Sequence, residues 1–336
     1  MQDTHPLVYN ARFPRSGPME LIRGIHNLKP EHRGCVATIG NFDGIHLGHQ
    51  AVIGQVSEKA QELGLPAVLM FFEPQPQEYF APAQVPPRLT RLREKLLTLR
   101  RFALDRVLMV QFNHAFAQLS AEAFIQRILV DKLGVRYLVV GDDFRFGQQR
   151  RGDFPLLQAA GVQHGFEVAN MHSFLVGDER VSSTLVREAL DAGDLARAEI
   201  LLGRPYRMAG RVRHGDKRGR TIGFPTANLY VHRRATPVAG VFAVEVFGVP
   251  GEPVAGVANV GTRPTVNGTR TQLEVFLFDF DTDIYGRYVQ VSFLHKLRAE
   301  QRFDSFDALR RQIDLDVAQA RTFFSNYYGN HGNDSL

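Results

Sequence analysis

The chain has 336 residues, of which 44% are hydrophobic and 22% charged. This length and composition exclude disordered and fibrous proteins and allow two separate hydrophobic cores. The net charge is +5 without a long run of like charges, so a nucleic-acid groove is not indicated and the basic residues suit a small polyanion better. With a single cysteine, Cys35, and no apolar stretch of membrane-spanning length, we expect a cytoplasmic protein that binds neither nucleic acid nor membrane.

Residues 34–177 alternate short apolar runs with helical patterns. Apolar runs at 35–39, 67–72, 106–111 and 137–141 predict strands, and residues 50–63, 90–101, 121–133 and 154–164 predict helices. This alternation is typical of a parallel α/β sheet with helices on both faces, whose ligands bind at the carboxyl ends of the strands. Residues 74–87 are too rich in proline for us to expect regular structure there.

The pattern changes after two predicted helices, one at 183–192 and a second that ends near Gly203. Short alternating runs at 241–247, 254–260, 273–280 and 288–293 predict an antiparallel β-barrel or sandwich. Apolar residues at helical spacing between Phe306 and Phe324 predict a final amphipathic helix that packs on it. We therefore expect an extension at 1–18, an α/β domain at 19–188, a linker at 189–204 and a second domain at 205–336.

The segment TIGNFDGIHLGHQ, residues 38–50, follows a predicted strand and opens a predicted helix. Its glycines allow the backbone to approach a phosphate, and the start of the helix offers free N–H groups and a positive dipole end. His46 and His49 fall on one face of that helix, where they can donate hydrogen bonds to a triphosphate as charge builds at the α-phosphorus. A chance meeting of two histidines with several glycines is the alternative.

This segment resembles the HxGH signature of the nucleotidyltransferase superfamily, and its wider form is similar to the FMN adenylyltransferase module of bacterial FAD synthetases. Residues 72–76 resemble the Phe-x-Pro-x-Pro turn of that module, with Gln75 where many members have histidine. Residues 140–147 resemble its flavin-side loop. Residues 180–187 resemble its Ser-Ser-Thr-x-x-Arg motif, which suits the departing pyrophosphate, although a serine there can equally act as a helix cap.

The resemblance implies roles for individual residues of the first domain. It implies that His46, His49 and Asn41 are catalytic. The residues that it implies for nucleotide binding are Gly40, Phe42, Gly48, Arg180, Ser183, Thr184 and Arg187. It implies flavin contacts for Asp143 and Phe144, although an aromatic side chain such as that of Phe144 can also belong to the core.

The second predicted domain opens with a loop of alternating glycines and cations at 210–223. Phosphate-binding loops have this composition, because glycine backbones present N–H groups and nearby cations offset the charge. The loop is not a P-loop, since Gly215 and Gly219 are one residue too close and Arg220 replaces the lysine. We predict that Gly215, Gly219 and Gly223 bind the nucleotide.

The run FPTAN at 224–228 resembles the Pro-Thr-Ala-Asn motif of riboflavin kinases, which implies that Thr226 and Asn228 hold Mg²⁺, a cation that prefers oxygen ligands. Residues 256–265 and 273–286 also resemble that module, which implies flavin contacts for Asn259 and Arg298. Glu274 is a carboxylate among apolar strand residues and can accept the proton of a primary alcohol that attacks the γ-phosphorus. A solvent-facing strand glutamate is the alternative.

Because the motifs of both modules occur in the family's order between about Glu20 and Tyr328, the chain is identified as a member of the bifunctional riboflavin kinase/FAD synthetase family. The resemblance implies a Rossmann-like domain that joins FMN to AMP from ATP, releasing FAD and pyrophosphate, and a barrel that phosphorylates riboflavin to FMN. It implies Mg²⁺ for both steps and riboflavin, FMN and ATP as partners. The oligomeric state is left open.

Two other interpretations compete with this one. HxGH domains also transfer nucleotides to other phosphorylated acceptors, but the kinase motifs of the second domain point independently to a flavin. A regulator with inactive sites is the other possibility, and the intact His46, His49, Thr226, Asn228 and Glu274 argue against it.

Overall fold

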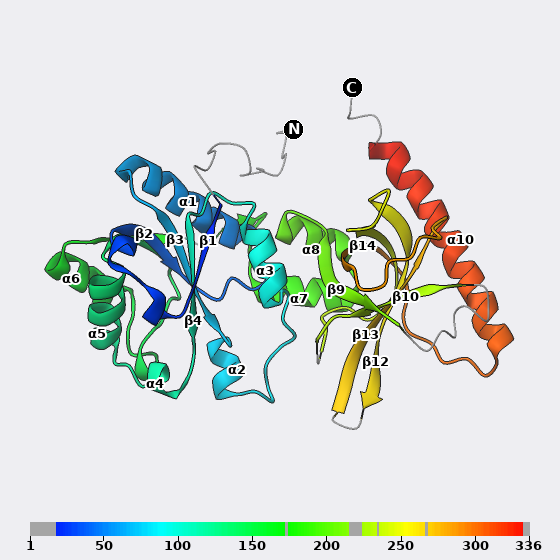
Figure 1. Cartoon of the computed structure of the whole chain (residues 1–336), viewed down its shortest axis with the longest axis horizontal. Coiled ribbons are helices and arrows are strands. Elements are labelled where there is room, and N and C mark those ends of the chain that lie inside the picture. The colour runs from blue at the N-terminus through cyan, green and yellow to red at the C-terminus, as the bar shows by residue number, and fades with distance from the viewer. Residues whose placement is uncertain (1–17, 172–173, 215–223, 234, 266–267, 332–336) are drawn as a thin grey trace. The chain divides into compact units, whose positions relative to one another are not determined.

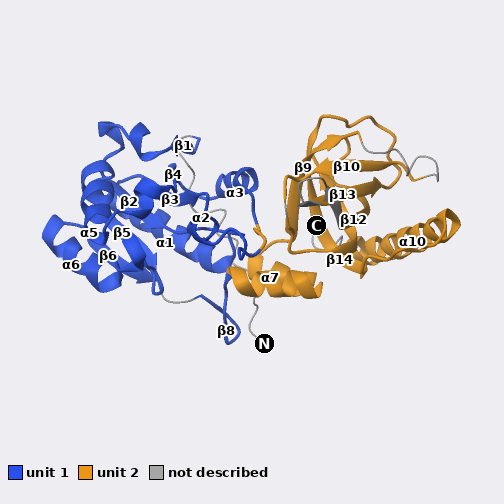
Figure 2. Cartoon of the chain, turned by 90° about the horizontal axis from the view of Figure 1, so that it is seen from below, with its two compact units in different colours: residues 1–86, 90–182 blue, residues 87–89, 183–336 orange. Residues whose placement is uncertain are grey.

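The structure is a computed structural model that describes residues 18–171, 174–214, 224–233, 235–265 and 268–331, without the side chains of 262–270 and 330–331. The chain forms two units, which Figure 2 distinguishes by colour. Unit 1 comprises Met1–Pro86 and Thr90–Ser182, and unit 2 comprises Pro87–Leu89 and Ser183–Leu336. Each unit has its own sheet, as described below.

Unit 1 contains a six-stranded, fully parallel sheet with the order β1-β4-β3-β2-β5-β6 (Figure 1). Its strands are β1 (Glu20–Arg23), β2 (Cys35–Ile39), β3 (Ala67–Glu73), β4 (Arg106–Gln111), β5 (Val135–Gly141) and β6 (Glu167–Met171). The parallel α/β sheet predicted from the alternating pattern is confirmed. The edge strands β1 and β6 were not predicted, because both are short and only partly apolar.

Helices cover both faces of this sheet, because successive strand residues point to opposite sides. Val36 and Phe71 pack with α1 (Leu47–Leu63) and α3 (Leu92–Leu99) on one face. Ala37 and Met70 pack on the other face with α5 (Ala121–Phe124), the π-helical segment η3 (Ile125–Lys132) and α6 (Phe154–His164). Every residue of β2 is buried, as the continuous apolar run predicts.

Short elements connect these helices and strands. They are η1 (Ile25–Asn27), η2 (Pro30–His32), α2 (Pro76–Phe80), α4 (His114–Ala117), η4 (Gln148–Arg150), β7 (Leu175–Val176) and β8 (Glu179–Arg180). The helix α2 corrects the expectation that residues 74–87 lack regular structure. Pro76 stands at the first helical position, where its missing N–H costs no hydrogen bond, and the carboxylate of Glu78 accepts a hydrogen bond from Gln75 N (2.8 Å).

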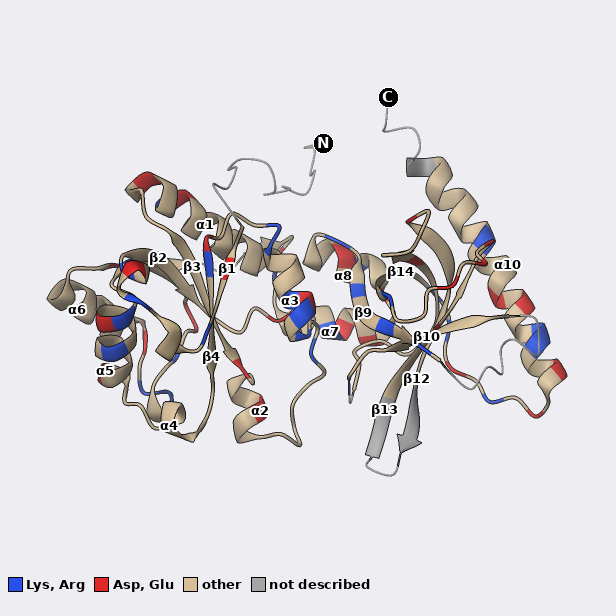
Figure 3. Cartoon of the chain, viewed as in Figure 1, with Lys and Arg blue, Asp and Glu red and all other residues tan. Residues whose placement is uncertain are grey.

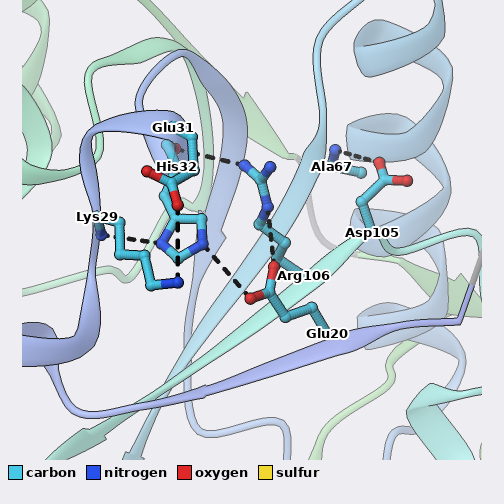
Figure 4. Close-up of polar contacts among 7 residues, drawn as sticks. All are labelled: Glu20, Lys29, Glu31, His32, Ala67, Asp105 and Arg106. Carbon is cyan, nitrogen blue, oxygen red and sulfur yellow. Dashed lines mark hydrogen bonds and ion pairs between the residues drawn. The ribbon is translucent and has the colours of Figure 1, made fainter.

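A polar network fastens the edge strand β1 to its neighbours (Figure 4). The carboxylate of Glu20 lies 3.4 Å from both His32 Nε2 and Arg106 Nε. His32 is buried, and its Nδ1 accepts a hydrogen bond from Lys29 N at 3.0 Å. The carboxylate of Glu20 is half exposed, so the network aligns β1 with β4 more than it stabilises the fold.

Unit 2 contains a closed antiparallel barrel with the order β10-β13-β12-β11-β14-β9. Its strands are β9 (Tyr206–Arg213), β10 (Thr226–Tyr230), β11 (Gly240–Phe247), β12 (Val254–Thr265), β13 (Gly268–Leu277) and β14 (Tyr288–Arg298). The predicted antiparallel barrel is therefore confirmed. Closure leaves no open sheet edge, and alternate residues of each strand fill the interior or face outward.

The two faces of the barrel have different packing partners. Phe242, Leu273 and Val275 are fully buried in its interior. On the outer face, the helix α10 (Phe306–His331) packs its Ala320 and Phe324 against Val241, Ala243, Val257 and Phe278. The predicted C-terminal helix on the barrel is thus confirmed. Acidic and basic residues are interspersed along α10 (Figure 3).

Two helices precede the barrel in unit 2, α7 (Ser183–Ala192) and α8 (Leu195–Leu202). The segment 189–204, interpreted as a linker, therefore contains the end of α7 and all of α8. The helix α8 packs against β9 and β14 within unit 2. Among the helices that the structure describes, none combines the length and apolar character needed to cross a membrane.

The burial of Cys35 in β2 makes its thiol a reporter of unit 1. Desolvation raises the pKa of the Cys35 thiol to about 12, so the reactive thiolate is scarce in the folded protein. We predict that a thiol reagent at pH 8 leaves the native protein unlabelled and labels it as urea unfolds unit 1. Cys35→Ala is the blank, because the sequence has one cysteine. Rapid stoichiometric labelling without urea would contradict this prediction.

Candidate active sites

The first candidate site lies in the turn that follows β2. The chain passes from β2 to β3 on one side of the sheet and later to β5 on the other side of β2, so the turn leaves the sheet at a topological switch point, where ligands of such sheets bind. Gly44 has φ 84°, and the non-glycine residues Phe42 and Ile45 have φ 48° and 47°. Such conformations cost roughly 1–3 kcal/mol each and persist where surrounding contacts hold them.

Thr90 holds this turn in its strained conformation. Its backbone N–H and its hydroxyl both donate to Asp43 Oδ1, at 2.9 and 3.2 Å, and its hydroxyl oxygen accepts from Gly44 N at 3.0 Å. Asp43 and Thr90 are buried, so these hydrogen bonds form away from water. The turn is therefore preorganised without a ligand.

The two histidines meet at the start of α1. His46 is the N-cap, and its Nδ1 accepts a hydrogen bond from His49 N at 3.4 Å, which places the ring proton on Nε2 as a donor. The two rings stack with their centroids 3.7 Å apart. The structure therefore brings His46 and His49 together, as their spacing predicts.

The surroundings of His49 keep its ring neutral. Desolvation lowers the pKa of His49 well below its usual value, and repulsion from His46, when that ring is protonated, and from Lys95 lowers it further. The residue is partly exposed as a whole, but its Nδ1 is shielded from water and has no hydrogen-bond partner among the described residues. A shielded ring nitrogen without a partner is what a site for a polar ligand leaves open.

Gly48 lies against the ring of His46. The sequence predicts that Gly48 binds the nucleotide, and this stays a prediction. A Cβ atom added at Gly48 would lie 3.2 Å from two atoms of the His46 ring and 3.5 Å from Val181 O. The missing side chain is therefore what allows the His46 ring to lie against the backbone of α1. A Cβ atom added at Gly40 would likewise lie 3.1 Å from the ring of Phe42.

The flavin-side loop and the segment before α7 approach each other within unit 1. Arg180 Nη2 lies 3.2 Å from Asp143 Oδ2 and 3.9 Å from Asp142 Oδ1. Phe144 is half-buried and stacks on Phe146 with ring centroids 5.6 Å apart. Arg180, predicted to bind phosphate, thus pairs with carboxylates on the loop predicted to contact the flavin.

Within the Ser-Ser-Thr-x-x-Arg motif, the residues from Ser183 onward belong to unit 2. Ser183 is the first residue of α7, Thr184 is exposed, and Arg187 Nε donates to Pro87 O at 2.7 Å. Their binding of the nucleotide stays a prediction.

Sequence reasoning missed two features of the first site. Lys95 is fully buried although it lies on a helix, and its Nζ donates to Asn41 O at 2.6 Å. An aromatic cluster lies at the carboxyl ends of β3 and β4. Its rings belong to Phe72, Tyr79, Phe80, Phe112 and Phe116. The proline-rich composition of 74–87 hid the cluster, whereas no local pattern distinguishes Lys95 from an exposed helical lysine.

The second candidate site is a row of polar residues across three strands of the barrel. Asn228 on β10 and Asn259 on β12 both lie directly opposite Glu274 on β13. Directly opposite residues of antiparallel strands share one face of the sheet. Since the neighbouring Leu273 and Val275 fill the interior, this row lies on the outer face, where Glu274 is half-buried. Thr226, two residues before Asn228, lies on the same face.

Gln272 links two members of this row. Its Nε2 donates to Glu274 Oε1 at 2.5 Å and to Asn228 Oδ1 at 3.0 Å. Both N–H bonds of the amide are thereby used, and the carboxylate acts as an acceptor. Sequence reasoning missed Gln272, because its importance depends on the register of β10 against β13.

Arg298, predicted to contact the flavin, forms a bidentate ion pair with the carboxylate of Asp316 on α10, at 2.8 and 2.7 Å. Gln312 Nε2 also donates to Asp316 Oδ1 at 3.0 Å. The predicted nucleotide-binding residues Gly215, Gly219 and Gly223 lie outside the described residues.

The oxygen atoms of the second site suit a hard cation that also binds the phosphates of a substrate. Thr226 and Asn228 supply neutral oxygens, and an amide oxygen that accepts one hydrogen bond retains a second lone pair. Among the described residues, no cluster of three or more His, Cys, Asp or Glu side chains is arranged to hold a metal. A Mg²⁺ ion bound by few protein oxygens together with substrate phosphates fits such residues.

Comparisons with known proteins match a separate family model to each part of the chain. The family model for FAD synthetase matches residues 28–185, and that for riboflavin kinase matches residues 202–324. The chain is 54% identical over 307 residues to the bifunctional riboflavin kinase/FMN adenylyltransferase of Escherichia coli K12, covering 91% of this chain and 98% of that protein. It is 51% identical over 308 residues to the protein of the same name from Haemophilus influenzae, covering 92% and 100%.

A solved structure described as a macrolide-efflux protein from Streptococcus pneumoniae has a TM-score of 0.75 and 31% identity, covering 89% of this chain and 97% of that chain. The fold and the two family models thus define a nucleotidyltransferase-like α/β unit combined with a kinase barrel. The chain belongs to the family of bifunctional riboflavin kinase/FMN adenylyltransferases, enzymes of FAD biosynthesis.

Gly48 offers a test of the first site. We predict that Gly48→Ala lowers the kcat/KM of FMN adenylylation at least about tenfold, because the new Cβ displaces the His46 ring and small displacements of reacting groups are costly. Alanine favours a helix over glycine, so the loss cannot come from a weakened α1. Gly329→Ala is the control, since a Cβ there meets nothing within 4 Å. Equal adenylylation by both variants would contradict the prediction.

Proposed function

We propose that unit 2 phosphorylates riboflavin with ATP to give FMN, and that unit 1 joins FMN to AMP from a second ATP to give FAD and pyrophosphate. The row formed by Asn228, Glu274 and Asn259 supports the kinase assignment most directly, because it combines a base with neutral oxygen ligands on one face. The stacked His46 and His49 at a helix start support adenylyl transfer.

In adenylyl transfer, a phosphate oxygen of FMN attacks the α-phosphorus of ATP, and the bond to pyrophosphate breaks. His46 donates Nε2–H, and the free N–H groups at the start of α1 add further donors for the charge that develops on the α-phosphate. His49, neutral because of its surroundings, offers a hydrogen bond without first gaining a proton. We assign Arg180, Ser183, Thr184 and Arg187 to the departing phosphates.

In riboflavin phosphorylation, the primary hydroxyl of the ribityl chain attacks the γ-phosphorus of ATP. Glu274 accepts the hydroxyl proton as the new P–O bond forms, and ADP leaves. Gln272 donates a hydrogen bond to the Glu274 carboxylate and so fixes its orientation beside Asn228. Thr226 and Asn228 are the residues that would hold Mg²⁺, which supplies charge neutralisation for the phosphates when bound.

We assign the flavin contacts to two groups of residues. In unit 1 they are Asp143 and Phe144, with the aromatic cluster at the ends of β3 and β4 as a further stacking surface for the isoalloxazine ring. In unit 2 they are Asn259 and Arg298. Because Asp316 holds two nitrogens of Arg298, the guanidinium is fixed in direction rather than free to rotate.

We further propose that the protein acts in the cytoplasm on small molecules, without nucleic acid or membrane. Interspersed acidic and basic residues on α3 and α10 support the absence of a nucleic-acid partner, since a nucleic-acid surface concentrates cations on one face (Figure 3).

A time course with purified protein, riboflavin, ATP and Mg²⁺, resolved by chromatography, tests the proposal. FMN should appear first and FAD should follow. Formation of FMN without FAD would contradict the proposed adenylylation by unit 1. Formation of FAD only from added FMN would contradict the proposed phosphorylation of riboflavin by unit 2. No conversion under oxidising or reducing conditions would overturn the whole proposal in favour of a binding protein.

Glu274→Gln separates the two activities. We expect riboflavin phosphorylation to fall by about a hundredfold or more, because glutamine cannot accept the proton, while adenylylation of added FMN is retained. Glu245→Gln is the matched control, because Glu245 is another strand glutamate of the barrel whose carboxylate accepts a hydrogen bond from Tyr328 OH at 2.8 Å. A fully active Glu274→Gln kinase would refute the assignment.

The metal assignment has a separate test. EDTA should abolish riboflavin phosphorylation, and excess Mg²⁺ should restore it. We expect Asn228→Ala to raise the Mg²⁺ concentration required for half-maximal velocity several-fold, because a hard-cation ligand is lost. Asn259→Ala is the matched comparison in the same row, and should raise the KM for riboflavin instead. If both variants change the same parameter, the division into metal and flavin ligands is wrong.

A further inference from the structure

Lys95 is a lysine whose side chain is fully buried. It lies on α3, shielded from water, and its Nζ lies 4.6 Å from the centroid of the Phe71 ring. Burying an ammonium group costs several kcal/mol, which its hydrogen bonds and other contacts must offset. The contacts of this ammonium group therefore decide where its charge acts.

The Lys95 ammonium acts on the backbone of the turn after β2. Its Nζ donates to Asn41 O at 2.6 Å, immediately before Phe42 with its φ of 48°. Thr90 holds the next two residues of the same turn, Asp43 and Gly44. One short segment of chain, 90–95, thus fixes both halves of the strained turn that leads into His46.

The charge of Lys95 also reaches the histidine pair. Lys95 and His46 are the two groups whose positive charges oppose protonation of His49, Lys95 from α3 and His46 from the start of α1. In a site shielded from water, such charges act more strongly than at the surface. The same cation favours an approaching triphosphate, whose charge is negative.

We propose that Lys95 is a positioning residue for adenylyl transfer, which locks the Asn41–Phe42 turn through a backbone carbonyl and places a positive charge near His49. The inference rests on the proposed adenylyl transfer by unit 1. Lys95 acts through the turn and the histidines, and a direct contact with substrate is not part of the proposal.

Three substitutions separate the hydrogen bond from the charge. Lys95→Met removes both, Lys95→Gln keeps a neutral donor, and Lys95→Arg keeps a charged donor. Lys132→Met is the control, because it removes the same charge from an exposed position in unit 1. The kinase activity of unit 2 in each preparation, with thermal unfolding curves, monitors the integrity of the chain.

We expect the kcat/KM of FMN adenylylation to fall about tenfold to a hundredfold in Lys95→Met, with a smaller loss in Lys95→Arg. The decisive readout is the pH profile. Because Lys95 opposes protonation of His49, Lys95→Met and Lys95→Gln should shift the acid limb of kcat/KM to higher pH, by about half a unit or more. The ionisation of ATP and FMN is common to all variants and cancels from the comparison.

The outcomes are distinct. If wild-type protein forms no FAD from added FMN, the proposed function of unit 1 fails. If wild-type protein is active and the neutral variants keep its acid limb, the proposed role of the Lys95 charge is overturned, whatever their stability. A variant that loses adenylylation because unit 1 unfolds gives a lowered melting temperature, and Lys95→Gln, which keeps a donor to Asn41 O, then provides the pH comparison.

Discussion

The strained turn after β2 is the constraint on which the first site depends. Phe42 and Ile45 adopt backbone conformations that cost energy for side-chain-bearing residues, and only contacts from elsewhere in the chain maintain them. Thr90 supplies such contacts through Asp43 and Gly44. The turn places His46 at the N-cap of α1, so the position of His46 and the stability of the fold depend on the same hydrogen bonds. A change in the segment that follows α2 therefore reaches the candidate catalytic residues without touching a ligand.

In the barrel, apolar side chains fill the interior, and the residues of the candidate site lie on the outer face. Closure fixes the register of β10, β13 and β12, and the register alone aligns Asn228, Glu274 and Asn259. A slip by one residue would turn Glu274 into the core. The site is thus as rigid as the barrel, which suits phosphoryl transfer, where positioning supplies much of the catalysis.

Much of the fold could be predicted from local pattern. Alternating helices and strands indicated the parallel sheet, and α6 and α7 occupy the residues that periodicity assigned to them. The strands β1 and β6 were missed because edge strands bury little and carry a weak apolar signal. The helix α2 was missed because proline was taken as a breaker, although at a first helical position it is well tolerated. Family motifs predicted the candidate residues of both sites, but not the contacts among them.

The sequence by itself determined the chemistry that each segment can perform. Glycines in the turn, two histidines at a helix start and a strand glutamate are properties of residue type and short spacing, which folding does not alter. Only the tertiary structure decided that Lys95 is buried behind the turn, that Gly48 makes room for His46, and that Gln272 joins Glu274 to Asn228. Each of these contacts joins segments through packing or strand register, and such contacts depend on the whole core rather than on neighbours in the chain.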